Sequence, residues 1–275
     1  MLQKYDKLRA PSLLALAAAG AAIMALPAAA ETACDLSDGY GQDVVSYVHE
    51  VEACLSASDA FSAERETAII ELSNKTRTDA GLDPLERRAS LDQAARAHAL
   101  DMAERNYAGH SDLEGRGHVY RMRALDRQVL ASATGANVVV LSAEATAGEI
   151  YASIISDEVN AANLARGGFN ATGLGVAEAD GRIYVVQMLT TVDGELETPL
   201  PLQLAGATSV QTRVTEDYFR TAGWNLTDEA GNRLAGGQLM RVPAESFDTS
   251  GNAYLDILVE LNADTYVLRG PIVSK

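Results

Sequence analysis

The candidate chemistry of this chain centres on His110, which follows Tyr107 and Gly109. An imidazole can bind a divalent metal or relay a proton near neutral pH. Glu149 and Glu158 are the carboxylates that could join it in a metal-assisted or proton-relay hydrolase. Zinc sites use three or four protein ligands, so His110 holds a metal poorly by itself. The sequence therefore allows an enzyme without supplying a complete catalytic set.

Other catalytic signatures are missing from the sequence. No serine stands in a Gly-x-Ser-x-Gly context, and no phosphate-binding glycine loop occurs. The two cysteines are expected to be oxidised, which removes a thiolate nucleophile. His98 lies between Ala95 and Met102 on an otherwise apolar helix face, so we predict a buried, hydrogen-bonded histidine rather than a ligand.

Two predicted helices precede His110. Ser62 and an acidic first turn mark the start of the first helix, and Gly81 marks its end. Ser90 and Gln93 have the spacing of a capping box for the second. The Gly-His pair follows the second of these helices.

Further elements follow His110. Residues 137–141 predict a buried strand, and Thr146 with Glu149 forms a capping-box pattern for a helix that continues to about Leu164. The capping role is a structural explanation for Glu149 that competes with a functional one.

Two strands and a β-rich tail complete the pattern. Residues 172–178 and 182–190 predict strands joined at Asp180-Gly181, a strong hairpin-turn pair. Beyond the prolines near position 200, short alternating segments and turn dipeptides predict strands over residues 200–275.

The stretch from residue 74 to residue 110 resembles the opening of the CAP/SCP superfamily of secreted domains, and the hairpin resembles the closing segment of that family. The resemblance covers about residues 65–190. The matching positions are Asn74, Arg77, Gly81, Leu82, Pro84, Leu85, Leu91, Ala94, Ala95, His98, Ala99, Asp101, Met102, Ala103, Tyr107, His110, Gly173, Gly175, Val176, Gly181, Tyr184, Val186 and Gln187.

Family members carry a cavity lined by two histidines and two glutamates, and the resemblance implies that most of this set is lost here. His110 matches the first histidine. The family's Gly-Glu-Asn resembles Gly135-Ala136-Asn137, which puts Ala136 at a glutamate position, and the second histidine corresponds to Asn160. Alanine cannot ligate, and an amide keeps its hydrogen bonds but does not titrate. The cleft-lining residues implied are His110, Asn137, Asn160, Glu158 and Glu149, with no metal and no cofactor.

The amino terminus predicts export. Lys4, Lys7 and Arg9 precede an apolar run that ends at Ala28-Ala29-Ala30, as in a secretory signal peptide. An uncleaved anchor is the alternative; after cleavage no integral membrane segment is expected. Cleavage changes the net charge from −16 to −18, since three basic and one acidic side chain leave. This acidic balance argues against nucleic acid as a partner.

Cys34 and Cys54 are the two cysteines of the chain. In an exported protein they are expected to pair with each other, and pairing between two molecules is the alternative.

The resulting fold prediction is α+β: an α-β-α sandwich of the CAP/SCP type with a small C-terminal β domain. We predict a signal peptide over residues 1–30, a disulfide-stapled helical segment over 31–61, a CAP/SCP-like domain over 62–195 and a β-rich domain over 200–275.

The leading functional hypothesis is a secreted or periplasmic protein, more non-catalytic than enzymatic, that binds an extracellular small molecule or a cell-envelope partner. The alternatives are a hydrolase acting on peptide or cell-wall polymer through His110, and a structural envelope protein acting through residues 200–275.

Overall fold

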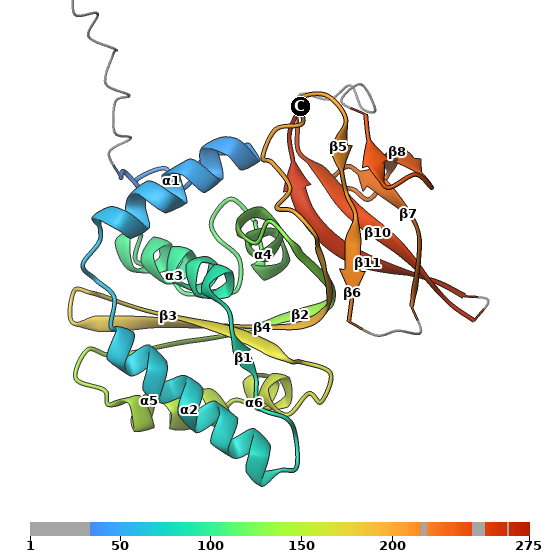
Figure 1. The fold of residues 1–275 in the computed structure, drawn as a ribbon. Coiled ribbons are helices and arrows are strands. Elements are labelled where there is room, and N and C mark those ends of the chain that lie inside the picture. Colours follow the sequence, from blue (N-terminus) through green and yellow to red (C-terminus); the bar gives the residue numbers. More distant parts are fainter. Residues whose placement is uncertain (1–33, 216–218, 244–250, 263) are drawn as a thin grey trace, which may run out of the picture. The chain divides into compact units, whose positions relative to one another are not determined.

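A computed structural model describes residues 34–215, 219–243, 251–262 and 264–275 (Figure 1). The predicted signal peptide lies outside these residues. Within them, no helix has the length and apolar character required to cross a membrane.

Helices dominate the first half of the described chain and strands the second. The elements in order are α1 (Val44–Ala57), α2 (Ala63–Asp79), β1 (Glu86–Arg87), α3 (Ala89–Glu104), α4 (His118–Leu125), β2 (Val129–Ser142), α5 (Ala147–Ser156), α6 (Glu158–Leu164), β3 (Ala171–Ala179), β4 (Arg182–Leu196), β5 (Thr208–Ser209), β6 (Thr212–Val214), β7 (Arg220–Thr227), β8 (Arg233–Gly237), β9 (Arg241–Val242), β10 (Ala253–Leu261) and β11 (Asp264–Val273).

Most strands join one sheet in the order β1-β3-β4-β2-β11-β10-β7-β8, and β6 also pairs with β4. Strands β1 and β3 are parallel, whereas the other pairs are antiparallel. Strands β5 and β9 form a separate two-stranded sheet. The sheet therefore begins in the helical half and continues into the C-terminal strands.

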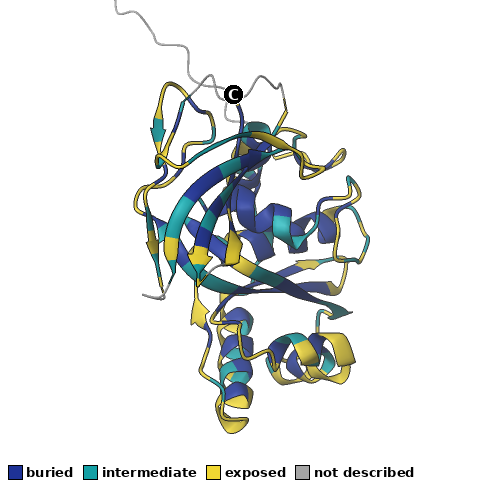
Figure 2. Cartoon of the chain, turned by 90° about the vertical axis from the view of Figure 1, so that its right-hand side faces the viewer, coloured by how far each residue is buried: buried dark blue, intermediate teal, exposed yellow. Residues whose placement is uncertain are grey.

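Helices cover both faces of strands β2, β3 and β4 (Figure 1). Along β4, Tyr184, Val186 and Met188 pack in the core formed with α1, α3 and α4. The alternate residues Ile183 and Val185 pack in the core formed with α2, α5 and α6. Both cores are visible as buried stretches in Figure 2. The predicted α-β-α sandwich is confirmed.

Two glycines of β3 let α3 lie directly on the sheet. A Cβ atom on Gly173 would clash with the backbone of Leu91 and Asp92, and one on Gly175 with the backbone of Arg96. Helix and strand could not approach this closely with any other residue there.

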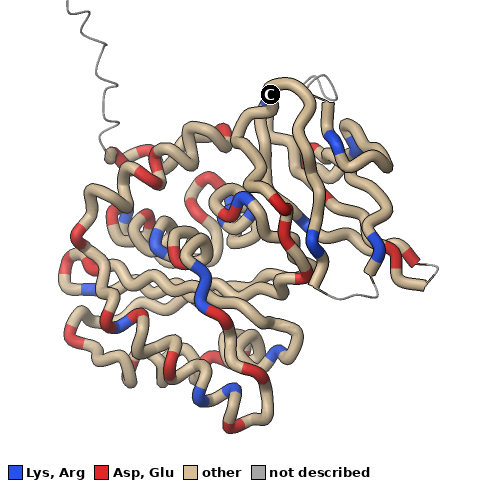
Figure 3. The backbone as a smooth tube through the Cα atoms, in the orientation of Figure 1, with Lys and Arg blue, Asp and Glu red and all other residues tan. Residues whose placement is uncertain are grey.

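Charged residues lie mostly on helices and loops, and the central strands carry few (Figure 3).

Several local signals act as predicted. Helix α2 ends at Asp79, and Gly81 follows with φ +76° while the amide of Leu82 donates to the carbonyl of Arg77. This pattern is a Schellman motif. Asp180 and Gly181 both have positive φ, as a tight hairpin turn requires.

Two local predictions are wrong. Helix α3 begins at Ala89, so Ser90 and Gln93 do not form a capping box. The Ser90 hydroxyl instead donates to the carboxylate of Asp126. The helix predicted from residue 146 to 164 is interrupted at Asp157, whose extended backbone ends α5 and whose carboxylate accepts the amide of Asn160 at 2.9 Å to cap α6.

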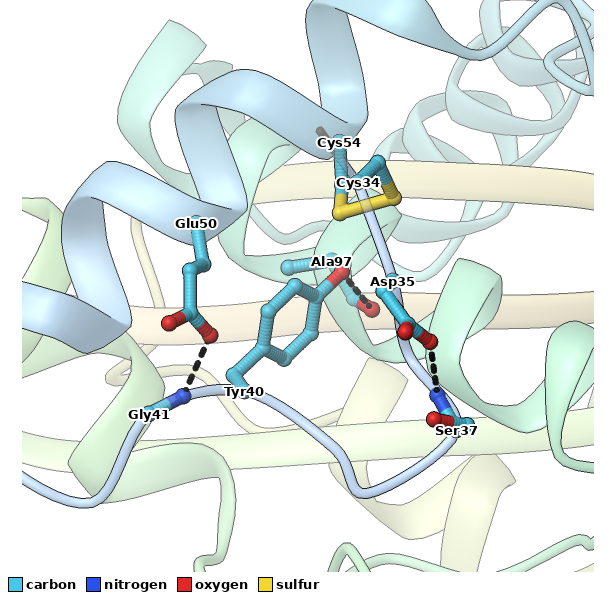
Figure 4. Close-up of a disulfide and its surroundings, with 8 residues drawn as sticks. All are labelled: Cys34, Asp35, Ser37, Tyr40, Gly41, Glu50, Cys54 and Ala97. Carbon is cyan, nitrogen blue, oxygen red and sulfur yellow. Dashed lines mark hydrogen bonds between the residues drawn. A yellow bond between two sulfur atoms is a disulfide. The ribbon is translucent and has the colours of Figure 1, made fainter. Parts of the chain in front are cut away.

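The segment before α1 is fixed to two helices. The disulfide between Cys34 and Cys54 joins it to α1, and the hydroxyl of Tyr40 donates to the carbonyl of Ala97 in α3 at 3.1 Å (Figure 4). The predicted pairing of the two cysteines is confirmed.

The C-terminal residues do supply strands, and four of these strands extend the same sheet. Strand β11 meets β2 at the single pair Arg269 and Ala131. Arg123 of α4 reinforces the joint by donating to the carbonyls of Leu255 and Gly270, both at 2.7 Å. The boundary at residue 200 stays a prediction.

Candidate functional site

His110 lies in the loop between α3 and α4, with an exposed ring. Its carbonyl accepts a hydrogen bond of 2.5 Å from Nη2 of Arg121, and Nη1 of Arg121 donates to the carbonyl of Arg116 at 2.8 Å. The side chain of Arg121 is almost fully buried, and this burial lowers its pKa. Arg121 therefore holds the loop that presents His110.

Two further histidines share this region. His98 in α3 is 1% exposed, and its Nε2 lies 2.8 Å from the carbonyl oxygen of Gly109, as expected of a buried, hydrogen-bonded histidine. Burial lowers the pKa of His98 well below the usual value, and the charges of Arg121, His110 and His118 act in the same direction. His118 begins α4 and is partly buried; burial, Arg121 and His110 lower its pKa.

His118 is the residue that sequence reasoning missed. It lies eight positions after His110, beyond the loop, and no helical or strand periodicity relates the two. Only the turn of the loop around Arg121 brings them into electrostatic reach. The lowered pKa of His118 favours its neutral form, in which an imidazole can bind a metal.

No carboxylate completes this histidine group at metal-ligand spacing among the described residues. Within them, the one such cluster of three is Asp101, Asp112 and Glu114. Arg105 bonds Asp101 at 3.1 Å and Glu114 at 2.6 Å, while Arg116 bonds Asp112 at 2.7 Å. These carboxylates are therefore neutralised by arginines in an ion-pair network.

Asn137 and Asn160 meet inside the protein. Nδ2 of Asn137 donates to the carbonyl of Asn160 at 3.3 Å and to Oε1 of Gln187 at 3.0 Å. Asn163 donates to Oδ1 of Asn137 at 3.0 Å, and Gln187 donates to Ser73 at 3.2 Å. The side chains join β2 and β4 to α6 and α2, so most of their hydrogen-bonding capacity is used within the fold.

Ala136 faces the opposite side of β2. It is 3% exposed and packs in the core formed with α1, α3 and α4. The resemblance places a glutamate of the family cavity at this position, and here a methyl group fills it. This face of the strand therefore offers no proton donor at residue 136.

Glu149 and Glu158 lie at helix starts on the surface. Oε2 of Glu149 accepts the amide of Thr146 at 2.8 Å in the predicted capping box, which is confirmed, and these hydrogen bonds lower the pKa of Glu149. Glu158 is the first residue of α6 and is exposed. Of the five predicted cleft residues, Asn137 and Asn160 are joined by a hydrogen bond; that all five line one cleft stays a prediction.

An apolar pocket of about 240 Å³ lies between α2, α5 and α6. Its apolar walls come from Ala80, Leu82, Ile155, Ala161, Leu164 and Ala165, with Thr76 and Arg77 at the side. The guanidinium of Arg77 donates to the carbonyls of Asp83, Leu164, Arg166 and Phe169. Since those bonds engage its charged end, Arg77 contributes mainly its aliphatic stem to the pocket.

The rim of this pocket is apolar too. Ile155, which lines the pocket, is 42% exposed. Exposed aliphatic side chains next to an apolar pocket are typical of a binding surface.

Residues 70–189 match the family model described as the cysteine-rich secretory protein family, CAP. The matched span contains the α-β-α sandwich and the residues of the candidate site. Residues 70–189 therefore form a CAP domain of the CAP/SCP superfamily.

Solved structures with a similar fold include an outer surface protein from Borrelia burgdorferi, at 15% identity and a TM-score of 0.42, covering 47% of this chain and 94% of that one. An extracellular protein containing an SCP domain from Bacillus anthracis str. Ames is 21% identical with a TM-score of 0.40. That match covers 46% of this chain and 40% of the Bacillus protein. A search of curated proteins finds no match.

Proposed function

We propose that this protein is an exported, non-catalytic CAP protein that binds an apolar group of an extracellular ligand or cell-envelope partner. The binding site in this proposal is the pocket between α2, α5 and α6. A secreted or periplasmic location is part of the proposal and rests on the pattern of residues 1–30.

The non-catalytic part rests on what occupies the family's cavity positions. Ala136 supplies a buried methyl group, and Asn160 is a buried amide whose backbone carbonyl accepts a hydrogen bond from Asn137. Acid–base catalysis needs a titrating group within hydrogen-bonding reach of its substrate, and neither side chain titrates near pH 7. Among the described residues, His110 belongs to no group of three side chains at metal-ligand spacing.

The binding part rests on the apolar lining and exposed rim of the pocket. Ligand sites for drug-sized molecules usually span roughly 300–1,000 Å³. A pocket of about 240 Å³ suits one end of an alkyl chain or a single ring. Burying about six methylene groups contributes roughly 5 kcal/mol, a dissociation constant a few times below 1 mM. Tighter binding requires contacts outside the pocket, where the exposed part of Ile155 is available.

The test is calorimetric titration of residues 31–275 with dodecanoic acid. Ala161 lines the pocket, whereas its neighbour Ala162 is exposed and does not line it. The Ala161→Trp variant should fill the pocket and lose binding by at least about tenfold. The Ala162→Trp variant adds the same side chain outside the pocket and should bind as the parent protein does.

Failure of the parent protein to bind dodecanoic acid at millimolar concentration would reject the apolar-ligand proposal. Equal binding by both tryptophan variants would show that the ligand binds outside this pocket. Circular dichroism of both variants establishes that each is folded.

A hydrolase is the second candidate, favoured by the electrostatic interaction between His110 and His118. It predicts hydrolysis of a peptide or cell-wall polymer that is lost in His110→Ala. The same variant leaves the dodecanoic acid titration unchanged, so the two functions are tested separately.

A further inference from the structure

Strand β8 ends the large sheet on its C-terminal side (Figure 1). Among the described residues its only strand partner in that sheet is β7, with Gly237 opposite Trp224 and Gly236 opposite Asn225. The other edge of β8 is therefore available for backbone hydrogen bonds. An exposed sheet edge is a template for an added strand.

A pocket of about 640 Å³ borders β8 on the face that carries Trp224. The indole Nε1 donates to the carbonyl of Leu239 at 2.6 Å, which fixes the ring. Trp224 is 3% exposed and packs in the core of the C-terminal strands, so its indole forms the floor of this pocket. Leu239 is 83% exposed at the pocket, and Arg241 lies beside it.

A second pocket of about 260 Å³ lies on the other face of the same strands. Strand alternation puts Gly223 and Asn225 on that face, opposite to Trp224. Its polar lining includes Arg233 and Glu260. Trp224, Gly237 and Gln238 border both pockets, so the two pockets lie on either side of one stretch of strand.

This arrangement matches the geometry of an added strand. Successive side chains of a strand point to opposite faces, so neighbouring residues of a peptide paired with β8 would enter the two pockets in turn. The larger pocket, with Trp224 and Leu239, suits a large apolar side chain. The smaller one suits a polar side chain of its neighbour.

The exposed arginines near β8 indicate the charge of the partner. Arg233 and Arg241 are exposed and form no ion pair with the described residues. They lie at the two pockets of a chain whose net charge is −16. A second copy of so acidic a chain is disfavoured by repulsion, whereas an acidic peptide segment is complementary.

We propose that the edge of β8 binds an extended acidic peptide segment of another protein by strand addition, with an apolar side chain held beside Leu239 in the larger pocket and a carboxylate paired with Arg233 at the smaller one. Backbone pairing supplies affinity without sequence preference, and the two pockets supply specificity. This site is separate from the pocket between α2, α5 and α6.

The probe is a short fluorescein-labelled peptide of alternating valine and threonine, with one central tryptophan followed by glutamate. Its binding is measured by fluorescence anisotropy. The Arg233→Glu variant should bind about 5–10-fold more weakly, as expected for reversing one exposed charge pair. The Arg220→Glu variant makes the same charge change on β7 outside both pockets and should bind like the parent protein.

A second readout tests strand addition itself. Hydrogen exchange should slow at amides of residues 233–237 when the peptide binds, and a peptide with proline in place of its threonines should neither bind nor protect them. Absence of binding at millimolar peptide would overturn the proposal, as would an equal loss in Arg220→Glu. Sedimentation showing a dimer that Arg233→Glu dissociates, without peptide binding, would assign the edge to a second copy instead.

Discussion

Replacing Arg123 by methionine tests the joint between the CAP domain and the C-terminal strands. Arg123 is 6% exposed. Its guanidinium donates to the carbonyls of Gly270 and Leu255 at 2.7 Å and to Oδ1 of Asp256 at 2.9 Å. It also lies over the ring of Tyr254, 4.9 Å from the centroid. One side chain thus holds both β10 and β11 against α4.

The expected cost follows from what the substitution leaves behind. Methionine keeps much of the volume but donates no hydrogen bond, so two carbonyls and the carboxylate of Asp256 lose their donor. Breaking a buried ion pair from one side costs about 3–5 kcal/mol, and a buried polar group left unpaired costs about 1–3 kcal/mol. Because water and local relaxation recover part of the sum, we expect a loss of about 4 kcal/mol in the free energy of unfolding.

Urea unfolding followed by circular dichroism measures this loss. A domain of this size loses roughly 2–4 °C of melting temperature per kcal/mol, so Arg123→Met should melt about 8–16 °C lower. The control Arg220→Met removes an exposed arginine and should change stability by less than about 0.5 kcal/mol. A loss below about 1 kcal/mol in Arg123→Met would refute the reasoning.

The pH dependence gives a second check on the same variant. Burial raises the pKa of Asp256, and Arg123 partly offsets the rise. A carboxyl group with a raised folded pKa favours folding below its unfolded pKa, and this contribution is lost as pH rises through the folded pKa. Without Arg123 the pKa of Asp256 rises further, so the deficit of Arg123→Met should shrink between pH 7 and pH 5.

Three other predictions follow from individual groups. Burial lowers the pKa of His98, so as pH falls the unfolded chain binds a proton before the folded protein does. The free energy of unfolding should therefore decrease below about pH 6.5. In urea unfolding at pH 5.5, His98→Gln should have lost about 1 kcal/mol less of this free energy than the parent protein. Breaking the disulfide by replacing Cys34 and Cys54 with serine should lower the free energy of unfolding by roughly 3 kcal/mol, and an unchanged urea midpoint would contradict this. Zinc should bind more weakly than about 1 μM in calorimetry, because His110 lacks a full ligand set; tighter binding that disappears in His110→Ala would favour the hydrolase.

Much of the CAP half of the fold could be predicted because its signals are local. Gly81 has the positive φ that ends a helix, and Thr146 and Glu149 cap each other across one turn. Asp180 and Gly181 form the hairpin turn. The local prediction failed at Ser90 because its hydroxyl finds the carboxylate of Asp126, 36 residues away, and a spacing pattern cannot show such a partner.

Only part of the candidate site could be predicted from the sequence. The resemblance pointed to Asn137 and Asn160, but the hydrogen bonds of Asn137 to the carbonyl of Asn160, to Asn163 and to Gln187 depend on how α6 lies against β2 and β4. His118 carried no pattern that relates it to His110. The pocket between α2, α5 and α6 is built from residues some 80 positions apart, each of which is an ordinary aliphatic or alanine in the sequence.

The sequence by itself determined the elements, their approximate order and the CAP class, because caps, turns and alternating apolar residues act within a few positions of the chain. It also determined that the cavity positions hold Ala136 and Asn160. Only the tertiary structure decided that β11 lies beside β2 and that β8 becomes the free edge of the sheet. Strand neighbours are chosen by long-range burial and backbone pairing, and contacts such as those of Arg123 exist only once distant strands have met.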